Sequence, residues 1–353
     1  MKKRYDFFNV GACHLPYFFV GSLLLLFFAC TGETAPKPTV STPPPTEMAT
    51  GGNPAIEALK QKIQASPDDP KLYAQRAKIY YDNEGYDEAI ADLNKALSYD
   101  STNVDYLHLL SDAQIDYYQS RKAVNTMKLA AMYHPTRIPT LLKLAELQMI
   151  VKQNTPSLRT IDEILKLEPQ NVDAYFLMGM NFRATGDESR AINSLQTVVE
   201  NDPDYLDAWV ILAQLFAKME NPIAIKYFDN AIRVDSTNIE ALTAKGNYLG
   251  GQGKFSEAIK VLKKIHQYAP QRPETYYNIG LAYLEMDSLE LAYQNFDIVI
   301  STSPTDYMAY FCRGITSEEK GDLNAARKDY QQALNLEPKF ERAKIALANL
   351  QQK

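Results

Sequence analysis

The sequence predicts an all-α fold built from about eight helix-turn-helix repeats stacked into a solenoid. The first observation is a period of 34 residues, at which a similar pattern of apolar residues returns along most of the chain. The second is helical spacing of small and large apolar residues on both sides of turn signals such as Thr185-Gly186-Asp187. Because one such hairpin can bury its apolar side only against its neighbours, the repeats are expected to stack.

The unit at 172–205 shows the pattern clearly, with a turn at Gly186. Its apolar, small and closing positions are Tyr175, Met178, Gly179, Phe182, Ala191, Leu195, Val198 and Pro203. These residue types at these spacings resemble the tetratricopeptide repeat. The resemblance implies a right-handed superhelical solenoid in which the first helix of each repeat lines a concave face. It also implies a recognition scaffold, a fold that serves many different partners.

Eight consecutive repeats are expected over 70–340, each ending near a proline or a polar loop. A preceding helix at 54–69 is interpreted as an N-terminal cap, and a final helix at 341–353 as a C-terminal cap, which solenoids need for solubility. The expected repeats are 70–103, 104–137, 138–171, 172–205, 206–238, 239–272, 273–306 and 307–340. The third is the most divergent, because Ser157 replaces the small apolar residue of its second helix.

The packing of each hairpin depends on small residues that let its two helices approach closely. Gly280 and Ala191 occupy such positions, and large apolar residues fill the space around them. A leucine at either position is expected to overpack the hairpin, at a cost of about 1–3 kcal/mol or more.

The N-terminal segment 1–29 is predicted to be a lipoprotein signal peptide. It starts with Lys2, Lys3 and Arg4, and the apolar run at 15–29 is shorter than the roughly 20 residues of a membrane span. Ala29 and Cys30 resemble a relaxed bacterial lipoprotein cleavage site, which implies lipidation at Cys30. An uncleaved signal anchor is the alternative, and it would also tether the chain to a membrane.

Residues 30–53 are predicted to be a lipidated cysteine followed by a flexible tether rich in proline and threonine. A Pro-rich docking peptide is the alternative for this stretch. Several acyl chains on one cysteine would anchor the protein stably. The expected location is therefore the bacterial cell envelope, with the outer membrane favoured over the inner one.

The resemblance also places particular side chains on the concave face, where a partner peptide or helix would bind. These candidate groove residues are Leu142, Met149, Ile150, Phe176, Met180, Val210, Tyr277, Leu281, Phe311 and Ile315. Apolar side chains at positions that nominally face solvent indicate either a ligand or burial within a tight superhelix, and the sequence leaves both open.

The charge of the chain limits the kinds of partner that it is expected to bind. The chain carries 37 basic and 43 acidic residues, a net charge of -6, which argues against nucleic acid. Acidic residues such as Asp112, Asp116 and Glu146 also outnumber basic ones at the expected groove positions. A protein segment with basic and apolar residues would complement this surface, and a merely solvating acidic face is the alternative.

No motif for catalysis, a cofactor or a metal stands out, so an enzyme is not expected. Gly250 to Lys254 only partly matches a phosphate-binding loop, because Phe255 replaces the Ser or Thr. The four histidines lie too far apart in the sequence for a metal motif. The alternative function is capture of a glycan or small molecule inside the superhelix, with Phe176, Tyr277 and Phe311 as stacking surfaces.

Overall fold

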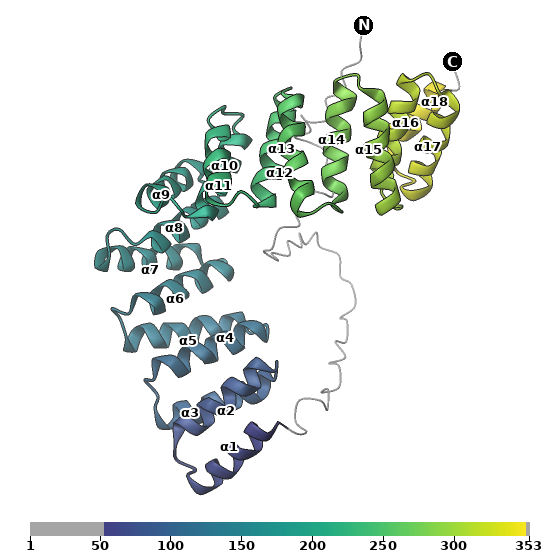
Figure 1. The fold of residues 1–353 in the computed structure, drawn as a ribbon. Helices are drawn as coiled ribbons and strands as arrows, with labels where there is room; N and C mark the ends of the chain where they lie inside the picture. Colours follow the sequence, from purple (N-terminus) through teal and green to yellow (C-terminus); the bar gives the residue numbers. More distant parts are fainter. Residues whose placement is uncertain (1–52, 351–353) are drawn as a thin grey trace, which may run out of the picture. The chain divides into compact units, whose positions relative to one another are not determined.

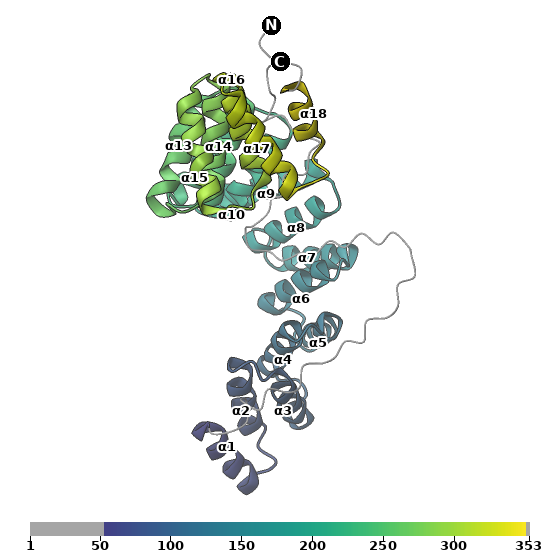
Figure 2. The same cartoon turned by 90° about the vertical axis from the view of Figure 1, so that its right-hand side faces the viewer.

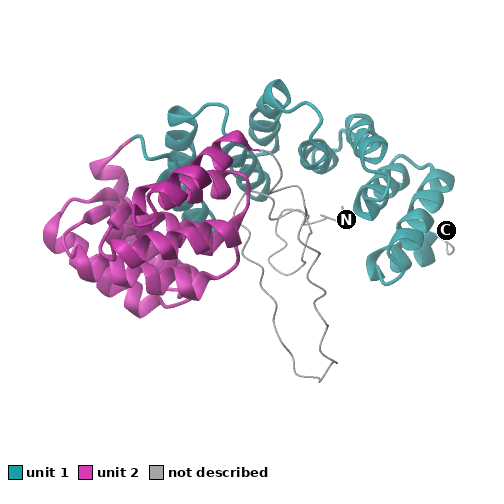
Figure 3. Cartoon of the chain, turned by 90° about the horizontal axis from the view of Figure 1, so that it is seen from below, with its two compact units in different colours: residues 1–26, 204–353 teal, residues 27–203 magenta. Residues whose placement is uncertain are grey.

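The computed structural model describes residues 53–350, and within this range every regular element is an α-helix. Figure 1 shows these helices arranged as successive antiparallel hairpins. The predicted all-α class with helix-turn-helix repeats is therefore confirmed. The described residues form two compact units, divided after Pro203, and Figure 3 colours them separately.

The N-terminal unit comprises one single helix followed by four hairpins, α2–α3, α4–α5, α6–α7 and α8–α9. Its helices are α1 Pro54–Ala65, α2 Pro70–Asp82, α3 Tyr86–Tyr99, α4 Val104–Asp116, α5 Ser120–Tyr133, α6 Ile138–Ile150, α7 Asn154–Leu167, α8 Val172–Ala184 and α9 Glu188–Asn201.

The C-terminal unit comprises four further hairpins, α10–α11, α12–α13, α14–α15 and α16–α17, and a last single helix. Its helices are α10 Leu206–Lys218, α11 Ala224–Val234, α12 Ile239–Gly251, α13 Phe255–Tyr268, α14 Pro273–Glu285, α15 Leu289–Thr302, α16 Tyr307–Glu319, α17 Leu323–Leu336 and α18 Glu341–Leu350.

Local sequence explains where many first helices begin. Asp69, Asn103 and Asn171 precede α2, α4 and α8, and each side chain accepts a hydrogen bond from a backbone N–H of the first turn. Such caps satisfy N–H groups that have no partner within the helix. Pro70 and Pro273 stand at the start of α2 and α14, where a missing N–H costs nothing.

Each hairpin turns through one residue with a positive φ at the same register, position fifteen of the repeat. Glycine supplies it at Gly186, Gly253 and Gly321. In the other five hairpins a residue with a side chain adopts this left-handed conformation, at an energetic cost that glycine avoids. These residues are Glu84, Tyr118, Lys152, Glu220 and Asp287.

The core of each hairpin is built from the small and large residues that the repeat pattern predicts. A Cβ added at Gly280 would lie 2.8 Å from the ring of Phe296, and one added at Gly179 would lie 2.8 Å from Leu195. Both large partners are fully buried. The glycines are therefore required by close approach of the two helices in these hairpins.

The divergent third repeat keeps its packing by hydrogen bonding. Ser157 is fully buried on α7, and its hydroxyl donates to the carbonyl of Ala145 at 2.7 Å. The side-chain amide of Asn181 on α8 in turn donates to the Ser157 oxygen at 3.0 Å. A polar residue is tolerated here because its hydrogen-bonding capacity is used within the core.

The first and the last repeat each contain an ion pair between their two helices, and the two pairs have the same spacing in the sequence. The repeat pattern did not predict these pairs. Arg76 on α2 makes two hydrogen bonds to Asp92 on α3, of 2.6 and 2.7 Å. Arg313 on α16 makes the same paired contact with Asp329 on α17, at 2.9 and 2.7 Å. In both pairs the residues are sixteen apart, and the planar guanidinium matches the carboxylate. The pairs tie the two helices of each hairpin together.

The signal peptide predicted at 1–29 and most of the tether predicted at 30–53 lie outside the described residues, and so does Cys30. Within the described part of the chain, none of the helices combines the length and apolar character needed to cross a membrane.

Candidate functional site

The candidate site is the surface formed by the first helices of the N-terminal unit, α2, α4, α6 and α8, which we call the first-helix face. In Figure 1, α2 and α4 lie on the same side of their hairpin partners α3 and α5, and Figure 2 shows the same helices from a perpendicular direction. Successive first helices touch, since α2 contacts α4 and α6 contacts α8. Side chains from neighbouring repeats can therefore act together on this face.

Polar side chains link successive repeats across the face. The Tyr81 hydroxyl of α2 donates to the carboxylate of Asp116 on α4 at 2.6 Å. Lys143 of α6 forms an ion pair with Asp112 of α4 and also donates to the carbonyl of His108 at 3.2 Å. Two of the acidic residues assigned to a partner by sequence therefore also hold the stack together.

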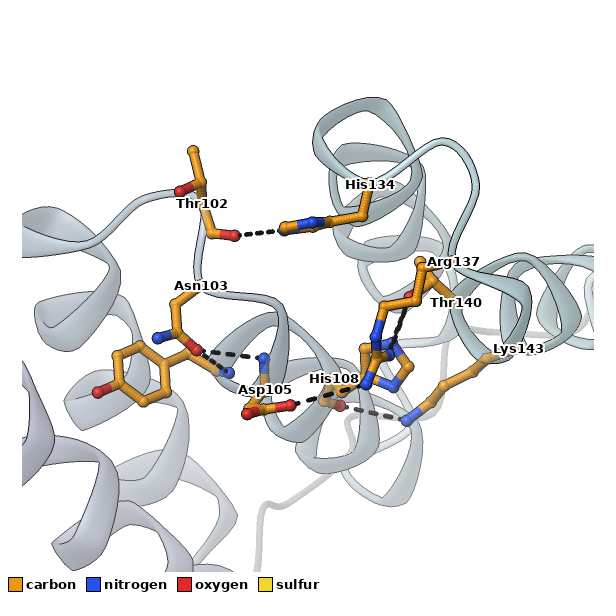
Figure 4. Close-up of polar contacts among 9 residues, drawn as sticks. Thr102, Asn103, Asp105, His108, His134, Arg137, Thr140 and Lys143 are labelled. Carbon is orange, nitrogen blue, oxygen red and sulfur yellow. Dashed lines mark hydrogen bonds and ion pairs between the residues drawn. The ribbon is translucent and has the colours of Figure 1, made fainter.

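A histidine lies at the centre of the polar contacts between α4 and α6 (Figure 4). His108 Nε2 is 2.9 Å from the Thr140 hydroxyl and 3.2 Å from the Arg137 guanidinium. Because a guanidinium only donates, Nε2 accepts, which is the arrangement of a neutral imidazole. Burial lowers the pKa of His108, and the neighbouring Lys143 and Arg137 lower it further. The lowered pKa of His108 favours the neutral imidazole, which accepts from Arg137 and links α4 to the start of α6.

Apolar side chains follow the polar ones toward the C-terminal end of the face. Leu142, Met149, Phe176 and Met180 are half-buried, and Ile150 is 42% exposed. These are the candidate groove residues that the sequence assigns to α6 and α8. They lie on α6 and α8, two helices that contact each other, and each side chain keeps part of its area exposed.

The charge of the face is less one-sided than the sequence indicates. Asp112 is paired with Lys143, Asp116 accepts from Tyr81, and Asp105 lies 3.9 Å from Arg137. Glu146 on α6 is exposed and forms no ion pair with a described residue. Its carboxylate stands one helical turn from Ile150, and it can therefore meet a cation carried by a segment bound to the apolar surface.

The remaining candidate groove residues belong to the C-terminal unit, and all five are buried in this structure. Val210, Tyr277, Leu281, Phe311 and Ile315 are each 2–5% exposed. Val210 packs with Ala231 and Ala241, and the other four are members of the large apolar cluster of α14–α18.

The two aromatic rings of that group already have partners within the unit. Tyr277 makes an edge contact with Phe296, with centroids 5.8 Å apart, and its hydroxyl lies 3.3 Å from the Cys312 sulfur. Phe311 contacts the rings of Tyr330 and Phe340, at 5.6 and 4.9 Å. Stacking of a ligand on these two rings would require displacement of these contacts.

Residues at one edge of the N-terminal unit escape the sequence analysis. Tyr118, Arg121 and Lys122 lie in and after the α4–α5 turn and line a surface groove. The only signal for them is a tyrosine at position fifteen, where three other repeats have glycine.

No cluster of three or more His, Cys, Asp or Glu residues suited to a metal ion occurs among residues 53–350.

Models of the tetratricopeptide repeat match four stretches of the chain. The matched residues are 70–103, 173–205, 273–306 and 307–340. They coincide with the hairpins α2–α3, α8–α9, α14–α15 and α16–α17. The chain therefore carries tetratricopeptide repeats.

Curated relatives share parts of this repeat array. The type IV pilus assembly protein PilF of Pseudomonas aeruginosa is 30% identical over 128 residues, which is 35% of this chain and 51% of PilF. RNA polymerase II-associated protein 3 of Mus musculus is 36% identical over 110 residues, 31% of this chain and 17% of that protein. The chain thus spans about half the length of PilF and about a sixth of the length of RNA polymerase II-associated protein 3.

Solved structures show similar folds at lower identity. PilW, described as a widely conserved type IV pilus biogenesis factor, is 20% identical, with a TM-score of 0.49 over 60% of this chain and 98% of that one. A tetratricopeptide repeat protein from Parabacteroides merdae is 17% identical, with a TM-score of 0.48 over 70% of this chain and 98% of that one.

Proposed function

We propose that this chain, which carries tetratricopeptide repeats, is a non-catalytic adapter tethered to a membrane of the bacterial cell envelope. In this proposal the first-helix face of the N-terminal unit binds a segment of a partner protein. Proteins with repeats of this kind mediate protein–protein interaction, and one relative, PilF, is a pilus assembly protein.

The observation that carries the proposal is the set of apolar side chains on α6 and α8 that keep part of their area exposed. Met149, Ile150, Phe176 and Met180 stand at positions where a solvated helix surface would have polar side chains. A helix or extended segment laid across α6 and α8 would bury these side chains, and burial of apolar area is the main gain in such binding.

The proposed partner segment combines apolar and basic residues. Its apolar side chains would meet Phe176 and Met180, and a lysine or arginine would meet the exposed carboxylate of Glu146. Because Asp112 and Asp116 already bond to Lys143 and Tyr81, the attraction rests on few acidic groups. Added salt should therefore weaken binding only modestly.

Site-specific photo-crosslinking in the native envelope tests the binding face. A photoreactive phenylalanine analogue replaces Phe176 or Met180 in the full chain, and the control carries it at Glu163, an exposed residue on the second helix α7. We expect a discrete protein adduct from both face positions and none from Glu163. Equal adducts at all three positions, or none at any with the protein intact, would contradict the proposal.

The membrane tether has a separate test. The change Cys30→Ala removes the thiol that lipidation needs, so the variant should leave the membrane fraction or accumulate as an unprocessed precursor. Fractionation and intact mass distinguish these forms from the lipidated protein. A variant that still fractionates as a mature, lipid-modified protein would refute lipidation at Cys30.

A further inference from the structure

A second candidate binding site lies at the turn edge of the N-terminal unit, away from the centre of the first-helix face. It is a surface groove of about 550 Å³ between the α4–α5 turn and the α6–α7 turn. The groove is wide open to solvent, so it offers a surface for a segment of a partner rather than an enclosed ligand pocket. We call it the turn-edge groove, and it shares only Ile150 with the apolar residues of the first-helix face.

Positive charge gathers in this groove although the chain as a whole is acidic. Arg121, Lys122 and Lys152 line it, and none of its lining residues is acidic. Arg121 and Lys122 are exposed, and neither forms an ion pair with a described residue. Helix α5 also begins here, with no acidic residue in its first turn, so its positive end adds to the potential of the cations.

Apolar surface adjoins these cations. Tyr118 is 94% exposed, the largest exposure among the large apolar side chains of the described residues, and Ile150 is 42% exposed. Tyr118 also has φ +59°, a conformation that glycine adopts at the same register in α8–α9, α12–α13 and α16–α17. This tyrosine does not stabilise the fold by burial, because its side chain is exposed. It also strains the backbone, because its positive φ is unfavourable for a residue with a side chain. Contact with another molecule is a role that would account for it.

We propose that the turn-edge groove binds a short acidic segment of a partner protein. A carboxylate of the segment lies between Arg121 and Lys122, and a neighbouring apolar side chain packs on Tyr118 and Ile150. Arginine and lysine both form charge-assisted hydrogen bonds to carboxylates, and the aromatic face excludes water beside them. This site has its own cations and its own aromatic residue, and it shares only Ile150 with the first-helix face.

A protein segment fits the surroundings better than a polyanion does. Asp116 stands two residues before Tyr118, and Glu146 stands one helical turn before Ile150. These carboxylates are close in sequence to the lining residues and would disfavour the repeated phosphates of a nucleic acid or an anionic lipid surface. A protein segment with one or two carboxylates next to apolar side chains can bind without bringing its negative charges close to Asp116 and Glu146.

Selection from a library of short random peptides tests the site on the full chain. Phage-displayed peptides are selected on the wild-type protein and counter-selected on the variant Arg121→Glu/Lys122→Glu. The enriched peptides should combine Asp or Glu with apolar residues. Their synthetic forms should lose about tenfold or more in affinity for the charge-reversed variant, which corresponds to about 1.4 kcal/mol.

Two further variants separate binding from folding. Arg159→Glu/Lys166→Glu makes the same charge change on exposed residues of α7, and it should leave the affinity unchanged. Tyr118→Gly should lower the affinity several-fold and yet melt at or above the wild-type temperature, because glycine tolerates the positive φ.

Several outcomes would overturn the proposal. They are a failure to enrich any peptide, enrichment of peptides without acidic residues, and equal affinity for the wild-type and charge-reversed proteins. Inorganic phosphate serves as the probe for a free anion. Saturable binding of phosphate, with no acidic peptide selected, would also overturn the assignment to a protein segment.

Discussion

Replacement of Gly280 by leucine tests the close approach of α14 and α15. A Cβ at this position would lie 2.8, 3.0 and 3.1 Å from the ring atoms Cε1, Cζ and Cδ1 of Phe296. The optimal distance between two non-bonded carbon atoms is about 3.5–4.0 Å. The distances from the added Cβ to these three ring atoms are therefore about 0.4–0.7 Å shorter than the lower end of that range. Leucine adds three more carbons beyond it.

The ring of Phe296 has little freedom to move away. It is fully buried and makes an edge contact with Tyr277. Overpacking of a dense core costs about 1–3 kcal/mol, and here four carbons enter an occupied space. The gain in helix propensity from replacing glycine is about 1 kcal/mol at most. We therefore expect Gly280→Leu to lower the free energy of unfolding by about 2 kcal/mol or more.

Urea unfolding followed by far-ultraviolet circular dichroism measures the effect, and hydrogen exchange locates it in α14 and α15. The control is Gln294→Leu, which adds a leucine at an exposed position of α15. The double variant Gly280→Leu/Phe296→Ala should cost at least about 1 kcal/mol less than the two single changes added together, because the alanine vacates the occupied space. An unchanged midpoint for Gly280→Leu, or strict additivity in the double variant, would refute the packing described.

Two further predictions concern titratable groups. The pKa of His108 is lowered in the folded state, so the unfolded chain takes up the proton first as the pH falls below about 6.5. Stability of the N-terminal unit should therefore decline from about pH 6.5 downward, and exchange of α4 and α6 amides should rise. The variant His108→Gln should lack this pH dependence, whereas an equal slope in both proteins would contradict it. Burial raises the pKa of Cys312 to about 12, so iodoacetamide at pH 8 should alkylate this thiol in urea but not in the folded protein. A cysteine at exposed Gln294 is the matched control, and comparable labelling of both thiols in the folded chain would contradict the burial.

The repeats could be predicted from the sequence because their packing is local. The small residue at Gly280 and the large one at Phe296 are sixteen residues apart and belong to one hairpin, so their spacing reports their contact. The same applies to Gly179 and Leu195. Family models match four of the repeats, and three of these matches have the bounds predicted from the period.

The candidate site could be predicted only in part, because the accessibility of a side chain depends on neighbours outside its own repeat. Phe176 and Phe311 occupy the same register position, yet Phe176 is half-buried whereas Phe311 is 4% exposed against Tyr330 and Phe340. From the sequence, Asp112 is likewise expected to be available to a partner, but in the structure it forms an ion pair with Lys143 of the next repeat. The lipid anchor and the location in the cell envelope remain predictions from the N-terminal sequence.

The sequence by itself determined the helical hairpins, their register and the small residues at their cores. These follow from a period of 34 residues and from contacts within one hairpin. Only the tertiary structure decided which side chains remain available to a partner. It paired Asp116 with Tyr81 and placed Arg121 and Lys122 beside Tyr118 and Ile150 in one groove. The physical reason is that stacking joins residues about 30 or more positions apart, and the pattern within a single repeat carries no record of those contacts.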